Sequence, residues 1–307
     1  SLVGSEMCIR DRNQGLKHLF NETCNTCSYS NHLTSHSPIL ISNKIYQLLP
    51  FDQSHPLALN RIMPVIGLAQ SLNWLDESQY KESSIASVDM LARYHNIDYV
   101  ETVLSAENNR CIPGTLGKRF NLGRHGNSYF SKIFTRPATT AGASILAGQL
   151  LAENEEGIIF SPAGGNHHAK KNQAAGFCIF NDPVLGILSM LDNGLKKVLY
   201  VDLDAHHGDG VQEAFQHDDR VFTISIHEKN RWPYTGKISE RGIGNTRNLP
   251  VPKELNDNEM RTLISEGVIP LGEEFEPDAL VIQSGADALL DLSLIHISEP
   301  TRLLSIA

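Results

Sequence analysis

Short apolar runs alternate with stretches of helical spacing along the central and C-terminal parts of the chain. The apolar runs are GIIFS from residue 157, KVLYVDLD from 197, RVFTISIH from 220 and DALVIQS from 278. Helical spacing is found at residues 56–75, 84–95, 138–152, 183–194 and 257–274. Short β-branched runs that alternate with helices are typical of a parallel sheet covered on both faces. The pattern therefore predicts an α/β fold with a mostly parallel sheet between two layers of helices.

The two ends of the chain do not continue this pattern. SLVGSEMCIRDR at residues 1–12 and LSLIHISEPTRLLSIA at residues 292–307 show no period that joins their neighbours. Both resemble translated adaptor or vector sequence, so we treat them as non-native tails and leave them out of the predicted fold. The expected domain runs from residue 13 to residue 291 and lacks its C-terminal strands and helices. Within it, residues 228–252 are expected to form a long polar loop, a feature that is usually functional.

The composition limits the classes of partner. A formal net charge of −9 argues against direct binding to nucleic acid. No apolar run approaches the ~18 residues that indicate a membrane-spanning helix, and no signal peptide is evident, so we expect a cytoplasmic protein with no membrane contact. The five cysteines include a lone CxxC at Cys24 and Cys27, which we interpret as incidental thiols.

Polar side chains follow three of the predicted strands at the point where each strand ends. His167 and His168 follow the first, Asp204 and His206 follow the second, and Asp287 follows the fourth. Open parallel sheets bind ligands at the carboxyl ends of their strands. A single Asp-x-His after one strand is equally consistent with a capping cluster, but the convergence of three such clusters favours a functional site.

The spacing of these residues indicates a metal centre. Asp204 and His206 have the same parity along an extended backbone, so both can face one ion, and Asp287 can reach it from another strand. Three protein ligands leave a position open, which is typical of catalytic metal sites. The set suits Zn²⁺, with Fe²⁺ and Mn²⁺ as alternatives. His167 and His168 are then candidates for general base and acid.

Three long motifs resemble the histone deacetylase superfamily, most closely its bacterial branch of acetoin utilization proteins. They are GGNHHAKKNQAAGFCIFND from 164, YVDLDAHHGDGVQEAF from 200 and QSGAD from 283, and the resemblance covers about residues 38 to 291. It implies an arginase-like α/β fold and a zinc ion held by Asp204, His206 and Asp287. It also implies that His167 and His168 are the acid/base pair, with Asp202 and Asp209 as their partners.

The resemblance implies further residues and a reaction. Gly176 and Phe177 would line an acyl-lysine channel with Trp232 opposite, and a structural K⁺ would be bound by carbonyls of residues 202–206 and by Ser225. The expected activity is zinc-dependent removal of acetyl groups from acetyl-lysine or a related acetylated amine. The oligomeric state and the exact substrate are left open.

Two alternatives remain open. One is a two-metal ureohydrolase of the same fold, although Asp204, His206 and Asp209 do not have the Asp-x-His-x-Asp spacing of that class. The other is an inactive metal-binding fragment. Family enzymes carry a transition-state tyrosine in a glycine-rich turn after the third motif, whereas here no glycine follows Gly285 and no tyrosine follows Tyr234. We therefore expect weak zinc binding and slow turnover from the chain as written.

Overall fold

The computed structural model describes residues 5–11, 37–48, 61–154 and 156–288. Its strands are β1 (Ser5–Asp11), β2 (Ile39–Ser42), β3 (Tyr80–Glu82), β4 (Glu156–Ser161), β5 (Val198–Asp202), β6 (Val221–Glu228), β7 (Thr246–Val251) and β8 (Ala279–Ser284). Its α-helices are α2 (Ile62–Ser71), α3 (Val88–Leu91), α4 (Ile97–Asn109), α5 (Gly114–Phe120), α6 (Thr135–Glu153), α7 (Asp182–Asp192), α8 (Asp209–Phe215), α9 (Asp257–Leu263) and α10 (Ile269–Phe275). Shorter helical segments are η1 (Lys44–Gln47), η2 (Glu77–Gln79), η3 (Ile264–Val268) and η4 (Ala286–Ala288).

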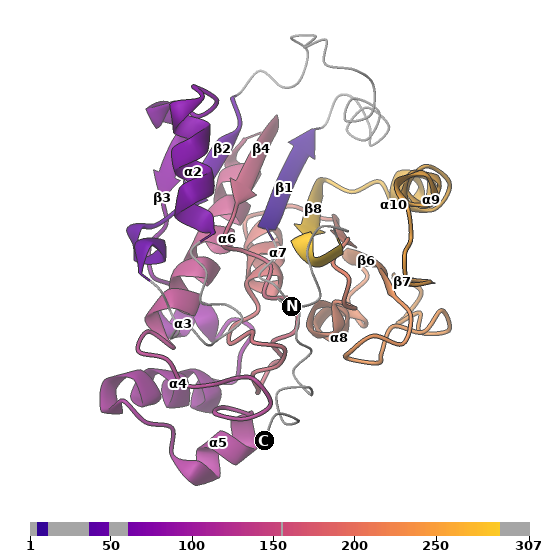
Figure 1. The fold of residues 1–307 in the computed structure, drawn as a ribbon. Helices are drawn as coiled ribbons and strands as arrows, with labels where there is room; N and C mark the ends of the chain where they lie inside the picture. The colour runs from indigo at the N-terminus through magenta and orange to yellow at the C-terminus, as the bar shows by residue number, and fades with distance from the viewer. Residues whose placement is uncertain (1–4, 12–36, 49–60, 155, 289–307) are drawn as a thin grey trace.

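The described strands form one eight-stranded sheet in the order β3-β2-β4-β1-β8-β5-β6-β7 (Figure 1). Every strand pair is parallel except the two pairs made by β1. This confirms the predicted mostly parallel α/β sheet. The predicted runs at 157, 197, 220 and 278 are β4, β5, β6 and β8.

Strand β1 corrects the expectation that residues 1–12 lie outside the fold. Ser5–Asp11 lies between β4 and β8 and is antiparallel to both. Cys8 and Ile9 are both buried, one on each face of the sheet. A strand covered on both faces does not alternate between apolar and polar residues, so its sequence gave no periodic signal. Arg10 is buried as well and donates to the carbonyl oxygens of Leu151 and Asn154 at 2.7 and 2.6 Å, at the C-terminal end of α6.

Helices cover both faces of the sheet, and alternate residues of each central strand point to opposite sides. Val198 and Tyr200 of β5 belong to a core built with α3 to α8, whereas Leu199 and Val201 belong to a second core packed against α9, η3 and α10. The expected helix at 257–274 is interrupted by the π-helical turn η3. Among the described helices, none is both long enough and apolar enough to cross a bilayer.

The segment expected as a loop at 228–252 ends in an edge strand. Residues 246–251 form β7, which pairs with β6. Pro250 lies in this strand, and proline is confined to sheet edges because it lacks an N–H to donate. Thr246 and Asn248 are buried on one face, while Leu249 and Val251 pack against the second core on the other, so one covered face of the strand is polar. That is why its pattern did not predict a strand.

Candidate metal centre and acid–base pair

Three loops at one edge of the sheet carry the side chains of the candidate site. His167 and His168 follow β4, Asp204 and His206 follow β5, and Asp287 lies in η4 after β8. These strands run in the same direction, so their carboxyl ends meet at the same edge. All five side chains are buried. The structure thus brings together the residues that the sequence singled out.

Asp204, His206 and Asp287 form the one group of potential metal ligands found among the described residues. One ligand atom from each lies within 4.8 Å of the others. Nδ1 of His206 is 3.0 Å from Oδ1 of Asp204 and 2.8 Å from Oδ2 of Asp287. Neighbouring ligands of a tetrahedral zinc ion lie about 3.3 Å apart, given bonds of about 2.0–2.2 Å. The cluster therefore has the donor types and nearly the spacing that one zinc ion needs.

The charges of this cluster also fit a cation. Burial raises the pKa of Asp204, and the negative charge of Asp287 raises it further. Burial alone would lower the pKa of His206, but its contacts with the two carboxylates outweigh burial and raise it. Oδ2 of Asp204 is buried and accepts no hydrogen bond from the described residues. The His206 ring thus lies between two buried carboxylates, where a positive charge is favoured.

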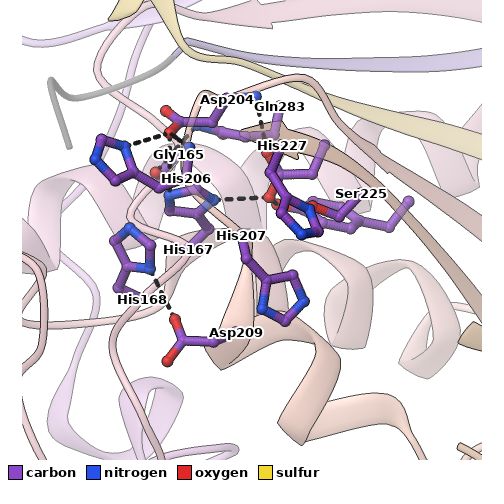
Figure 2. A network of polar contacts seen from close by, with 12 residues as sticks. Gly165, His167, His168, Asp204, His206, His207, Asp209, Ser225, His227 and Gln283 are labelled. Atoms are coloured by element: carbon purple, nitrogen blue, oxygen red, sulfur yellow. Dashed lines mark hydrogen bonds and ion pairs between the residues drawn. The ribbon is translucent and has the colours of Figure 1, made fainter. Parts of the chain in front are cut away.

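The tandem histidines each face a carboxylate with one ring nitrogen. Nδ1 of His167 is 2.7 Å from Oδ2 of Asp202, and Nδ1 of His168 is 2.7 Å from Oδ1 of Asp209 (Figure 2 shows the second contact). Nε2 of both rings is buried and has no hydrogen-bond partner among the described residues. Nε2 of His167 lies 3.8 Å from Oδ1 of Asp204. The two free nitrogens are therefore next to the metal cluster, where a reacting molecule would be.

The two neighbouring imidazoles differ in their affinity for a proton. Burial would lower the pKa of His167, but Asp202 and Asp204 outweigh it and raise the value to about 9. Burial and the adjacent charge of His167 lower the pKa of His168 well below its usual value. Burial raises the pKa of Asp209 to about 6, although Lys170 opposes the change. A protonated His167 and a neutral His168 are thus favoured next to each other.

Asp182 holds the turn that leads into the tandem histidines. This buried carboxylate, at the start of α7, accepts hydrogen bonds from the backbone N–H groups of Gly165 and Asn166 at 2.9 and 2.8 Å. It also accepts from the Asn166 side chain at 2.6 Å and from the Ser144 hydroxyl at 2.9 Å. A buried carboxylate with four donors fixes its neighbours firmly. Sequence reasoning missed this role.

Asn181 and His95 fix the same loop from the other side. Nδ2 of Asn181 donates to the carbonyl oxygens of His167 and Ala169 at 3.3 and 2.8 Å. Nε2 of His95 accepts from the backbone N–H of Asn181 at 2.9 Å, so Nδ1 of His95 donates to the carbonyl of Lys170 at 3.0 Å. The Asn-Asp-Pro start of α7 was a readable helix cap. Its contacts with a loop at residues 165–169 were not readable, because they depend on tertiary packing.

The expected channel residues lie on two sides of His168. The Trp232 ring centroid is 4.7 Å from that of His168 and 6.2 Å from that of His206. A Cβ added to Gly176 would lie 2.5 Å from the His168 ring and 2.7 Å from the Trp232 ring, so only glycine fits there. Phe177 has its backbone N–H on Oδ1 of Asn127 and its ring against Gly126. Gly176 and Trp232 therefore border His168 directly, and Phe177 continues this wall toward the loop at 121–128.

A comparison with known sequences gives the family. The profile of the histone deacetylase domain matches residues 55–298, which include the metal cluster, the tandem histidines and the channel residues. The chain belongs to the histone deacetylase family. The resemblance inferred from the three motifs is thereby confirmed, and so is the fold class that it implied.

Individual members of the family cover most of this chain. Histone deacetylase 6 of Arabidopsis thaliana is 35% identical over 252 residues, which are 78% of this chain and 52% of that protein. The acetoin utilization protein AcuC of Bacillus subtilis is 30% identical over 266 residues, 85% of this chain and 68% of AcuC. The chain thus spans about half the length of several eukaryotic relatives.

Solved structures of the family agree with the fold. The crystal structure of an HDAC homologue from Aquifex aeolicus has a TM-score of 0.72 at 34% identity, over 79% of this chain and 66% of that one. An HDAC homologue in complex with SAHA has a TM-score of 0.71 at 33% identity, over 78% of this chain and 65% of that one.

Proposed function

We propose that the protein hydrolyses the acetyl amide of acetyl-lysine, or of a related acetylated amine, at one zinc ion held by Asp204, His206 and Asp287. One observation carries the proposal. A buried group of two carboxylates and an imidazole lies next to two buried imidazole nitrogens that have no hydrogen-bond partner among the described residues. Membership of the histone deacetylase family supports the reaction class. The relative complexed with SAHA supports a ligand site in this fold.

The donor set decides which ion suits the cluster. When bound, the metal supplies Lewis acidity to the amide carbonyl and to water. Two carboxylates and one imidazole suit zinc, and Fe²⁺ or Mn²⁺ are the alternatives that metal exchange would test. A structural K⁺ is proposed at the carbonyls of residues 202–206 and Ser225. The alignment of Ser225 on β6 with Asp202 on β5 supports that position.

The tandem histidines move the protons of the reaction. Water adds to the carbonyl carbon, the C–N bond breaks, and acetate and the free amine leave. One proton must leave the attacking water, and one must reach the amine nitrogen. Asp202 and Asp209 hold Nδ1 of His167 and His168, which leaves the two Nε2 atoms as the ones that exchange protons with the substrate.

The wall formed by Gly176, Phe177 and Trp232 selects a slender acyl group. Glycine at 176 brings the backbone close to both His168 and Trp232. This close approach supports an unbranched acylated side chain, such as acetyl-lysine, as the substrate class.

The test measures metal content and acetate release in parallel. We expect about one zinc per chain, release of acetate from an acetyl-lysine peptide, and loss of both in Asp204→Asn. Two manganese ions per chain with hydrolysis of a guanidinium substrate would establish the ureohydrolase alternative. One bound zinc without any acetate release would establish the metal-binding fragment instead.

A further inference from the structure

A second pair of buried histidines lies beside the metal cluster and takes no part in the proposed proton transfers. His207 directly follows the ligand His206, and His227 lies near the end of β6. Their side chains are buried, and their ring centroids are 4.8 Å apart. Figure 2 shows the two rings to the right of the His167 ring, whereas His168 lies to its left. Unlike the tandem pair at 167–168, neither ring contacts a carboxylate.

The partners of His207 fix its tautomer. The Gln212 side chain donates from Nε2 to Oε2 of Glu240 at 2.9 Å, which turns its Oε1 toward His207. Because Oε1 can only accept, Nε2 of His207 carries the proton and donates at 2.9 Å. Nδ1 of His207 is 2.7 Å from the Thr235 hydroxyl, which donates to it when the ring carries its proton on Nε2 alone.

The partners of His227 impose the same tautomer. Nε2 of His227 is 3.1 Å from the carbonyl oxygen of Gly236 and must donate to it. Nδ1 of His227 is 2.9 Å from the Ser225 hydroxyl, which can donate to it. The two rings thus bind two consecutive residues, Thr235 and Gly236. Both hydrogen bonds connect the sheet edge to the segment that follows Trp232.

The turn at Thr235 and Gly236 has little freedom to move. A Cβ added to Gly236 would lie 2.5 Å from the His227 ring and 2.7 Å from the His207 ring, so the backbone is packed directly on both imidazoles. The backbone N–H of Gly236 also lies 3.3 Å from Oε2 of Glu240. Trp232 precedes Thr235 by three residues, and its ring faces His168. The position of the turn therefore sets the position of the Trp232 ring.

We propose that His207, His227 and Thr235 are positioning residues that hold Trp232 against His168 and so set the width of the approach to the catalytic histidine. None of the three needs to touch the substrate. The kinetic part of this proposal rests on the proposed function, whereas the placement of Trp232 does not. The two can therefore be tested separately.

The placement can be followed by fluorescence. The chain has two tryptophans, and the other one, Trp74, is 74% exposed. In a Trp74→Phe background, Trp232 is the sole reporter. Acrylamide quenching of its emission measures how open the ring is to solvent, without metal, substrate or activity.

Thr235 offers a matched pair of variants. It is exposed, so its replacement leaves the core intact. Thr235→Val keeps the shape and removes the hydroxyl donor to His207, whereas Thr235→Ser keeps the donor. Loss of one such bond changes the population of displaced Trp232 by about fivefold. We expect stronger quenching in Thr235→Val, His207→Asn and His227→Asn, and wild-type quenching in Thr235→Ser.

Thr223→Val is the control for general loss of stability. Thr223 is buried on the same strand as His227, and its hydroxyl bonds to Thr246, away from Trp232. This variant should unfold at a lower temperature and leave quenching unchanged. If it raises quenching as much as His227→Asn does, or if Thr235→Val and Thr235→Ser behave alike, the positioning role is wrong.

The kinetic arm adds a second readout. Displacement of the Trp232 ring should weaken substrate binding more than it slows the chemical step. Thr235→Val should therefore raise KM by about fivefold with a smaller change in kcat. Thr235→Ser should keep KM at the wild-type value. A change in kcat alone would contradict the proposal. If the wild-type chain releases no acetate while the quenching pattern holds, the proposed function fails and the positioning of Trp232 stands.

Discussion

Two His-His dipeptides lie side by side at the edge of the sheet, and their ring nitrogens have different partners. At 167–168 both Nδ1 atoms face carboxylates and both Nε2 atoms are left without a partner among the described residues. At 206–207 the first ring lies between Asp204 and Asp287, while the second has both nitrogens occupied by neutral groups. The roles proposed above follow this division of partners: His167 and His168 exchange protons, His206 is a metal ligand, and His207 positions its neighbours.

The difference lies in the partners rather than in the histidines. A carboxylate on Nδ1 stabilises the charged ring and frees Nε2 for chemistry, as at His167. A hydroxyl and an amide on the two nitrogens satisfy a neutral ring completely, as at His207, and leave it nothing to exchange. The role of a buried histidine therefore depends on which ring nitrogen has no partner and on the charge of the group that faces the other ring nitrogen.

The largest effect is expected at the metal ligands. Asp204→Asn or Asp287→Asn removes one of the two charges that the cluster offers a cation. Lewis acidity contributes several kcal/mol to the barrier, so we expect kcat to fall by about 10³-fold or more, together with the zinc content. Zinc per chain and acetate release should be measured on the same preparation. Full zinc content with full activity in either variant would remove the cluster from the mechanism.

The next effect separates the two dipeptides directly. His167→Asn and His168→Asn should each lower kcat by about 10²-fold or more, because general acid–base catalysis contributes on that scale. His207→Asn should act mainly on KM. Zinc content should remain near wild type in the first two variants, since neither ring is a ligand. Equal kcat losses at His168 and His207 would mean that the unpaired nitrogen is not what distinguishes them.

A third kind of buried histidine sharpens the same comparison through pH. His95 is 2% exposed, and burial lowers its pKa to about 4 from an ordinary value of 6.5. Its Nε2 accepts from Asn181, so a second ring proton would meet an N–H. Between pH 6.5 and 4 the unfolded chain binds a proton that the folded chain does not. His95 therefore favours the folded state above that window, and this contribution is lost as the pH falls through it.

The effect is measured by urea unfolding at a series of pH values. A shift of this size corresponds to about 3 kcal/mol of unfolding free energy across the window. His95→Asn should be less stable than wild type at pH 7 and should lose less stability on acidification. Parallel curves for the two proteins would show that His95 does not govern the acid sensitivity.

The sequence predicted those parts of the fold that depend on local pattern. β4, β5, β6 and β8 were readable because each is a short β-branched run, and three of them are followed by a polar cluster. The site followed from the same runs, because parallel strands deliver their C-terminal ends to one edge. The contacts of the metal cluster and of the tandem histidines could thus be anticipated from spacing and motif alone.

What the sequence did not predict depends on partners far away in the chain. β1 has no alternating pattern because both of its faces are covered, and β7 carries polar residues where an edge strand is expected to carry apolar ones. Asn181 and Asp182 begin α7, and they also bind the loop at 165–169. These additional contacts depend on tertiary packing, which a short stretch of sequence does not reveal.

The smallest effect is expected at the carboxylates behind the tandem histidines. Asp202→Asn and Asp209→Asn keep the size of the side chain and remove its charge. An amide does not stabilise imidazolium and permits either tautomer, so each change should lower kcat by about 10–100-fold, on the scale of other orienting partners.

The two aspartates differ in their other contacts. Asp202 also accepts from the Tyr200 hydroxyl at 2.8 Å and from the backbone N–H of Asp204 at 3.1 Å, whereas Asp209 lies beside Lys170. Asp202→Asn should therefore disturb zinc content as well as kcat, while Asp209→Asn should affect kcat alone. Tyr200→Phe is the control, since it removes one donor to Asp202 without touching His167. Its kcat should lie between those of wild type and Asp202→Asn, and a value below that of Asp202→Asn would show that the hydroxyl, rather than the carboxylate, orients His167.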